Sequence, residues 1–125
     1  WLKQQIGNAQ NIEYLGWLPE DELLEVYRKA KVFALPSFVE GVGMAALEAA
    51  VNGAEIVLTN IGAPKEYYDG RAVLVDPNSV DSIGKGVLEA MTTKKAQPEL
   101  RQHILNNYTL DVNCKQLQDI LKANL

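Results

Sequence analysis

The sequence predicts an α/β protein with a mainly parallel, Rossmann-like sheet of about four strands flanked by helices. Short apolar runs alternate with longer helical patterns along the 125 residues, which is typical of strand–helix–strand units. The later runs are almost continuously apolar, as expected for strands that are covered on both faces. Because the chain is short and has no linker-like segment, we expect residues 1–125 to form a single domain.

Four apolar runs are the candidate strands: "NIEYLG", "KVFALPS", "EIVLTN" and "AVLVDP". Gly16 closes the first of them, and Pro36 and Pro77 stop the second and the fourth. Each run holds about four to six residues rich in aliphatic, β-branched or aromatic side chains. Ligands of open parallel sheets bind beyond the carboxyl ends of the strands, so the loops after these runs are the candidate binding loops.

Helical patterns fill the segments between the candidate strands. Residues 19–31 begin with a proline and three acidic residues and end with basic ones, the order that a helix dipole favours. Residues 44–52 are a short Ala-rich pattern closed by Gly53. Residues 63–70 suit one or two helical turns, and two further helices are expected after residue 97.

The helical pattern over residues 79–94 contains two glycines that a helix interior normally avoids. Gly84 and Gly86 each cost about 1 kcal/mol relative to Ala, which is understandable if they permit close packing. The apolar stripe predicted to face the core consists of Val80, Ile83, Val87 and Met91.

Composition narrows the function classes. The net charge of −4 disfavours nucleic acid or an anionic membrane surface as a partner. The single cysteine, Cys114, rules out an intrachain disulfide and favours a reducing, cytoplasmic location. No second histidine or cysteine stands at ligand spacing from Cys114 or His103, so no metal cofactor is expected.

The loop after the second run and the helix that follows it read "SFVEGVGMAALEAA". Gly41 and Gly43 permit backbone angles that other residues avoid and allow a ligand to approach the main chain. A helix that begins near Gly43 or Met44 points unpaired N–H groups at an anion, typically a phosphate. Glu40 and Glu48 could accept hydrogen bonds from sugar hydroxyls, so a nucleotide-sugar fits the segment. On this segment alone, solvated acids and ordinary turn glycines remain the alternative.

Five short segments occur in an order that resembles the donor-binding domain of retaining GT-B glycosyltransferases of family 4: "YLGWLP", "VFALPS", "EGVGMAALE", "TNIGAPKE" and "VLVDP". The resemblance covers about residues 11–92. It implies transfer of a sugar from a UDP- or GDP-sugar to a hydroxyl of a glycan or lipid-linked glycan, with retention and without a metal cofactor. The resemblance is compatible with a role in polysaccharide biosynthesis.

The resemblance assigns roles by position. Glu40 matches the carboxylate that contacts the transferred sugar and is the catalytic candidate, whereas Glu48 matches the carboxylate that binds the ribose. The main-chain groups near the sugar and diphosphate correspond to Gly41, Val42, Gly43 and Met44. The segment that lines the nucleobase corresponds to Gly16, Trp17 and Leu18.

Several positions depart from the family pattern or have no family role. Val42 stands where the family usually has Phe, and Ala63 replaces a frequent glycine, so the donor stays open. Tyr67 and Tyr68 either pack on the sheet or fringe the donor cleft, and packing is the favoured interpretation. His103 is expected to have a surface or packing role.

The resemblance further implies that the chain is the later part of a C-terminal domain. The acceptor domain, and an Arg and a Lys that neutralise the diphosphate, would precede residue 1. We therefore expect the isolated chain to bind donor weakly, to transfer little sugar and to self-associate through exposed sheet edges. Any peripheral membrane association would come through the missing part. Two alternatives stay open, a GT-B nucleotide-sugar epimerase and a non-catalytic Rossmann-like binding or assembly module.

Overall fold

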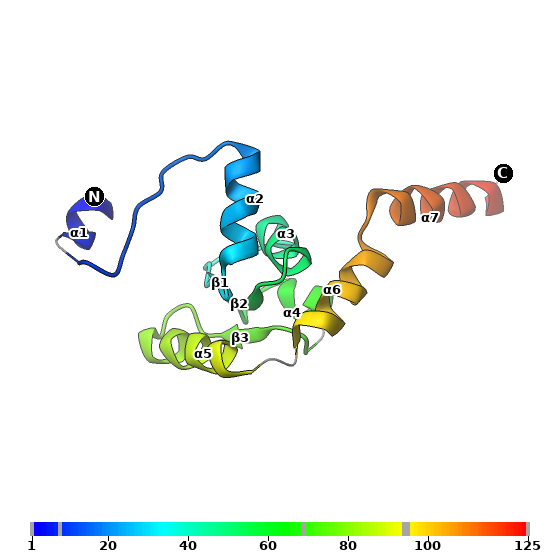
Figure 1. The fold of residues 1–125 in the computed structure, drawn as a ribbon. Helices are drawn as coiled ribbons and strands as arrows, with labels where there is room; N and C mark the ends of the chain where they lie inside the picture. Colours follow the sequence, from blue (N-terminus) through cyan, green and yellow to red (C-terminus); the bar gives the residue numbers. More distant parts are fainter. Residues whose placement is uncertain (1, 8, 69, 94–95, 125) are drawn as a thin grey trace.

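The computed structural model describes residues 2–7, 9–68, 70–93 and 96–124. Its elements follow one another along the chain as Figure 1 shows. They are α1 (Leu2–Ile6), α2 (Glu20–Lys29), β1 (Val32–Leu35), α3 (Met44–Val51), β2 (Glu55–Thr59), α4 (Pro64–Tyr68), β3 (Val73–Val75), α5 (Val80–Thr92), α6 (Ala96–Asn107) and α7 (Leu110–Ala123).

The sheet of the described residues has three parallel strands in the order β1-β2-β3. Leu35 pairs with Leu58, and Thr59 pairs with Val75, so the carboxyl ends of the strands are nearly level. Every residue of the central strand β2 is buried. This arrangement confirms the predicted α/β class and the parallel sheet, and it leaves β1 and β3 as the edge strands.

Helices cover both faces of the sheet (Figure 1). Ile56 and Leu58 of β2 face a core that α2, α3, α4 and α6 complete. Val57 faces the opposite side, where it packs with Val75 of β3 and with Ala90 of α5. Because alternate residues of β2 are covered from either side, the strand is apolar throughout its middle rather than alternating.

The predicted first strand is wrong. Residues 11–16 pair with no strand among the described residues, and Ile12, Tyr14 and Leu15 are exposed. A strand needs a neighbour for its backbone hydrogen bonds and a cover for its apolar face, and this segment has neither here. It runs away from the sheet toward α1 (Figure 1). The sheet therefore has one strand fewer than predicted.

The prediction that the glycines of α5 permit close packing is confirmed for Gly86 but not for Gly84. A Cβ built on Gly86 would lie 2.3 Å from Cγ1 of Val75, so this glycine permits the close approach of α5 to the sheet. A Cβ on Gly84 would meet nothing within 4 Å. The predicted stripe was too long, because Val80 and Met91 are exposed. The face that packs on the sheet consists of Ile83, Gly86, Val87 and Ala90.

Helix α3 ends at Val51, and Gly53 closes it as the sequence predicted. The amide of Gly53 donates to the carbonyl of Ala50, and the amide of Ala54 donates to that of Ala49, which is the Schellman arrangement. Arg101 of α6 adds a side-chain bond, because its Nε donates to the carbonyl of Val51 at 3.0 Å. The end of α3 is thereby fixed against α6.

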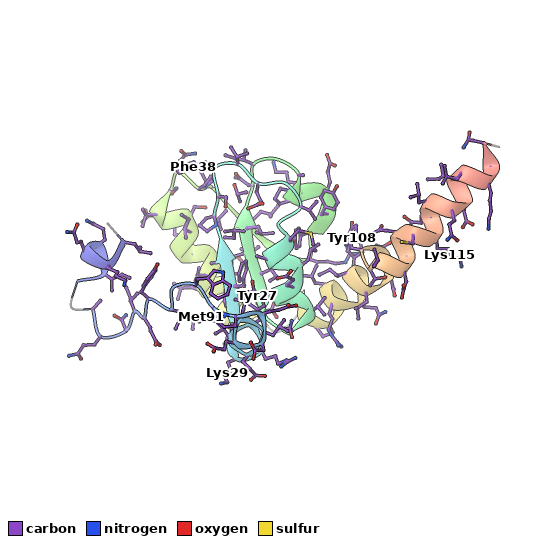
Figure 2. The ribbon with its side chains drawn as sticks, turned by 90° about the horizontal axis from the view of Figure 1, so that it is seen from above. Tyr27, Lys29, Phe38, Met91, Tyr108 and Lys115 are labelled. Carbon is purple, nitrogen blue, oxygen red and sulfur yellow. The ribbon has the colours of Figure 1, made fainter. Side chains whose placement is uncertain are left out.

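Helix α7 extends away from the rest of the molecule (Figures 1 and 2). Thr109 caps its first turn, since the Thr109 hydroxyl accepts from the amide of Val112. None of its residues is buried, and Leu110, Leu117 and Ile120 are exposed apolar residues. No helix of the described ranges has both the length and the apolar character needed to cross a bilayer.

Candidate functional site

The loop that carries the predicted motif leaves the sheet at its carboxyl edge. Strand β1 ends at Leu35, and the following residues reach α3 at Met44. Phe38 and Val39 are exposed on this loop, whereas Glu40 is half-buried. Figure 2 shows Phe38 on the opposite side of the body from Lys29, which ends α2. The loop therefore occupies the edge where open parallel sheets place their ligands.

Helix α3 begins with two amide groups that have no partner among the described residues. Gly43 is the N-cap residue and adopts the left-handed φ of 72°, which strongly favours glycine. Its carbonyl accepts from the amides of Ala46 and Leu47, and no side chain of the described residues caps the helix. The amides of Met44 and Ala45 are left as free donors, so the helix start can receive an anion.

The side chain of Tyr68 in α4 contacts the backbone at the start of α3. Its side chain is 1% exposed, and its hydroxyl donates to the carbonyls of Val42 and Gly43 at 3.2 and 3.1 Å. Burial raises the pKa of the Tyr68 hydroxyl, and the charges of Glu40 and then Tyr108 raise it further. The hydroxyl therefore stays protonated and remains a donor. Packing was predicted for Tyr68, but its link to the motif was missed.

The loop after β2 approaches the motif loop at Gly62. Gly62 adopts a φ of 83°, and a Cβ on it would lie 2.9 Å from the carbonyl oxygen of Glu40. Two hydrogen bonds shape this second loop: the amide of Asn60 donates to the Val75 carbonyl at 2.8 Å, and the amide of Ile61 donates to Thr59 Oγ1 at 3.2 Å. The loops after β1 and β2 thus support one another at the carboxyl edge.

Glu48 lies on the exposed side of α3, one helical turn after Met44. Residues four apart share a helix face, so both line the same hollow of about 300 Å³ between α3 and the α6–α7 junction. The rest of that lining is mainly apolar and includes Leu47 and Tyr108. Burial raises the pKa of Tyr27, and the charge of Glu48 adds to the rise.

The structure does not bring the predicted nucleobase segment to the motif. Gly16 and Trp17 are exposed, Trp17 to 87%, and Leu18 is half-buried ahead of α2. No hydrogen bond or ring contact of the described residues links these three residues to Glu40 or Glu48. Their role stays a prediction from the sequence resemblance.

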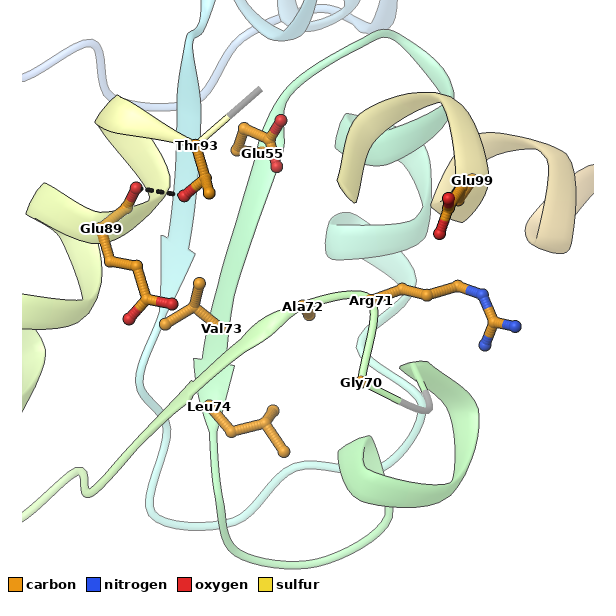
Figure 3. A pocket seen from close by; sticks show the side chains of 9 residues that line it. All are labelled: Glu55, Gly70, Arg71, Ala72, Val73, Leu74, Glu89, Thr93 and Glu99. Atoms are coloured by element: carbon orange, nitrogen blue, oxygen red, sulfur yellow. Dashed lines mark hydrogen bonds between the residues drawn. The ribbon is translucent and has the colours of Figure 1, made fainter. Parts of the chain in front are cut away.

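A second hollow, of about 380 Å³, opens at the amino edge of the sheet (Figure 3). Glu89 and Thr93 lie on one side of it, where the Thr93 hydroxyl donates to the Glu89 carbonyl, and Arg71 and Glu99 lie on the other. No pattern in the sequence predicted this hollow. Open α/β sheets bind ligands at the other edge, so we assign it no role. Within the described ranges, no three His, Cys, Asp or Glu residues are grouped to hold a metal ion.

Comparison with known proteins gives a consistent result. The family described as "Glycosyl transferases group 1" matches residues 2–109. The O-antigen chain mannosyltransferase B of Escherichia coli is 36% identical over 92 residues, which cover 73% of this chain and 24% of that protein. A D-inositol 3-phosphate glycosyltransferase of Corynebacterium jeikeium is 35% identical over 94 residues, covering 70% of this chain and 22% of that protein.

A solved structure shares the fold. The sucrose-phosphate synthase of Thermosynechococcus elongatus superposes with a TM-score of 0.77 over 99% of this chain and 33% of its own, at 19% identity. The chain thus spans between about a fifth and a third of the length of these similar proteins.

Proposed function

This chain belongs to the group 1 glycosyl transferases, and we propose that its motif loop and the start of α3 bind a nucleotide-diphosphate sugar, UDP- or GDP-linked. The whole protein transfers the sugar to a hydroxyl of a glycan or lipid-linked glycan, with retention. One observation carries the proposal: the left-handed Gly43 starts α3 with free amide donors three residues after Glu40.

The diphosphate is the part of the donor that the helix start suits. The amides of Met44 and Ala45 have no described acceptor, and the dipole of α3 adds a partial positive charge at the same point. Negative charge grows on the diphosphate as the sugar leaves, so donors fixed there stabilise the transition state more than the ground state. The proposal includes no metal cofactor, in keeping with the resemblance to GT-B glycosyltransferases.

The two carboxylates suit the hydroxylated ends of the donor. Glu40 precedes the helix start and contacts the transferred sugar, which makes it the candidate for the catalytic site. Glu48 lies one turn further along the Met44 face and accepts hydrogen bonds from the ribose. A hydrogen bond to a charged group contributes about 1.5–3 kcal/mol. Loss of either carboxylate should therefore lower the affinity for the donor by roughly tenfold or more.

Two further elements of the proposal concern pathway and location. Because one similar protein is named as an O-antigen chain mannosyltransferase, the favoured role is polysaccharide biosynthesis. The mildly acidic composition and single cysteine favour a cytoplasmic protein without a nucleic-acid partner.

Titration of the 125-residue chain tests the site. UDP, GDP and the UDP- and GDP-sugars are titrated against the wild type, Glu48→Ala and Glu40→Ala by NMR at millimolar ligand. Glu48→Ala should lower the affinity for the nucleoside diphosphates about tenfold. Glu40→Ala should lower the affinity for UDP- or GDP-sugars only. The control is Glu22→Ala, which removes an exposed carboxylate from α2. Absent binding, or equal binding by all four proteins, would favour the non-catalytic module.

The edge strand β1 supports the proposal of self-association. No described strand pairs with its outer side, and an open edge can pair with another chain. Light scattering of the 125-residue chain at rising concentration tests this, and a constant monomer mass would refute it.

A further inference from the structure

We propose that Tyr68 is a positioning residue of the donor site, because its buried hydroxyl fixes the direction of the two consecutive amide N–H groups of Gly43 and Met44. The inference rests on the proposed function, since the Met44 amide is one of the two free donors that face the diphosphate. Tyr68 is 1% exposed, so it touches no ligand and acts only through the loop.

The Tyr68 hydroxyl contacts two consecutive carbonyl groups of the motif loop. The hydroxyl of Tyr68 lies 3.2 Å from the Val42 carbonyl oxygen and 3.1 Å from the Gly43 carbonyl oxygen. One proton is shared between two acceptors. Gly43 has other donors, the amides of Ala46 and Leu47. For the Val42 carbonyl, the hydroxyl is the one donor found among the described residues.

Peptide geometry links the direction of each carbonyl to that of the amide that follows it. A trans peptide is planar, and its C=O and N–H groups point in opposite directions. The Val42 carbonyl and the Gly43 amide belong to one peptide, and the Gly43 carbonyl and the Met44 amide belong to the next. Because Tyr68 holds both carbonyls, it fixes the direction of both amides, and the amide of the exposed Met44 points away from Tyr68. The Met44 amide is thereby held beside the free amide of Ala45 at the helix start, where an anion can bind.

Helix α4, which carries Tyr68, is itself anchored to α6 and to the residue that follows α6. Helix α4 brings Tyr68 to the motif, and the neighbouring Tyr67 ties the same helix to α6. The His103 Nε2 lies 3.2 Å from the Tyr67 carbonyl oxygen, and the Tyr67 ring packs against Tyr108 with centroids 5.6 Å apart. Tyr68 is therefore held on a helix anchored at its other side, so its hydroxyl can hold the loop in place.

The test compares Tyr68→Phe with Tyr67→Phe. Both variants remove one hydroxyl, but the structure gives the Tyr67 hydroxyl no hydrogen-bond partner among the described residues. UDP and GDP are titrated against the 125-residue chain, and the amide signals of Gly43 and Met44 are followed by NMR. Tyr68→Phe should lower the affinity for both diphosphates about three- to tenfold and leave the affinity for uridine and guanosine unchanged. Tyr67→Phe should bind all four as the wild type does.

Each outcome decides the proposal. Equal weakening of the nucleosides would mean a general loosening of the fold and would overturn the positioning role, as would unchanged diphosphate affinity. If the wild type binds neither UDP nor GDP, the proposed function fails and a ligand-free measurement decides instead. In the wild type, the Gly43 and Met44 amides should be as rigid as α3, with an order parameter of about 0.85. Mobile amides there, or amides equally rigid in Tyr68→Phe, would refute the role of Tyr68.

Discussion

Replacement of Gly62 by Ala measures how strongly the loops after β1 and β2 support one another. A Cβ at this position would lie 2.9 Å from the Glu40 carbonyl oxygen, inside normal contact distance. Gly62 also has a φ of 83°, a conformation that costs a residue with a side chain about 1–2 kcal/mol. The variant therefore combines two penalties, backbone strain and a collision with the motif loop.

Gly70→Ala separates the two penalties. Gly70 has a φ of 72°, and a Cβ there would meet nothing within 4 Å. It should lose only the strain term. Overpacking typically costs about 1–3 kcal/mol, so Gly62→Ala should be less stable than Gly70→Ala by about that amount. For a domain of this size, the difference corresponds to roughly 4–12 °C in Tm.

Urea and thermal unfolding of both variants provide the measurement, with an unchanged urea m value as evidence of comparable two-state unfolding. Gly62→Ala should also shift the NMR signal of the Glu40 amide, and Gly70→Ala should not. Equal losses of stability, together with an unmoved Glu40 signal, would show that the two loops do not press on each other. The two loops would then not form one mutually supported site.

Three other predictions concern the scaffold. Urea unfolding should give opposite signs for the two α5 glycines: Gly86→Ala loses about 1–3 kcal/mol, because its Cβ would lie 2.3 Å from a strand valine, and Gly84→Ala gains up to about 1 kcal/mol in open space. Arg101→Met, which removes the 3.0 Å bond to the Val51 carbonyl, should lower the free energy of unfolding by about 0.5–1 kcal/mol in the same assay. Folding raises the pKa of Tyr68, so its contribution is complete below an unfolded-state pKa of about 10 and is lost as pH rises above it. Between pH 9 and 11.5, the stability of Tyr68→Phe should therefore fall less steeply than that of the wild type.

The sequence predicted those parts of the fold that depend on local pattern. The three runs covered on both faces became β1, β2 and β3, and the charge order of residues 19–31 marked α2. The failed strand at 11–16 has the right composition, but strand formation depends on a neighbour that composition does not reveal. Likewise, Gly84 and Gly86 look equivalent in sequence, and only the position of β3 distinguishes them.

The candidate site was predictable where contacts are close in sequence. The glycines around Val42 indicated a helix start with free amides, and Gly43 takes that role. The contact of Tyr68 with the motif spans 25 residues, and no pattern in either segment announces it. The approach of Gly62 to Glu40 is of the same kind, because it depends on how two loops meet after separate strands.

The contrast between β2 and α7 has a consequence for how the protein opens. All of β2 is buried, whereas no residue of α7 is. A helix of 14 residues has little stability on its own, so α7 should unwind and reform without disturbing the sheet. Its amide protons should exchange with solvent almost freely, while those of β2 should exchange only through global unfolding. Limited proteolysis should therefore cut within α7, as within the exposed segment 11–16, and leave a resistant body that retains the sheet and α3.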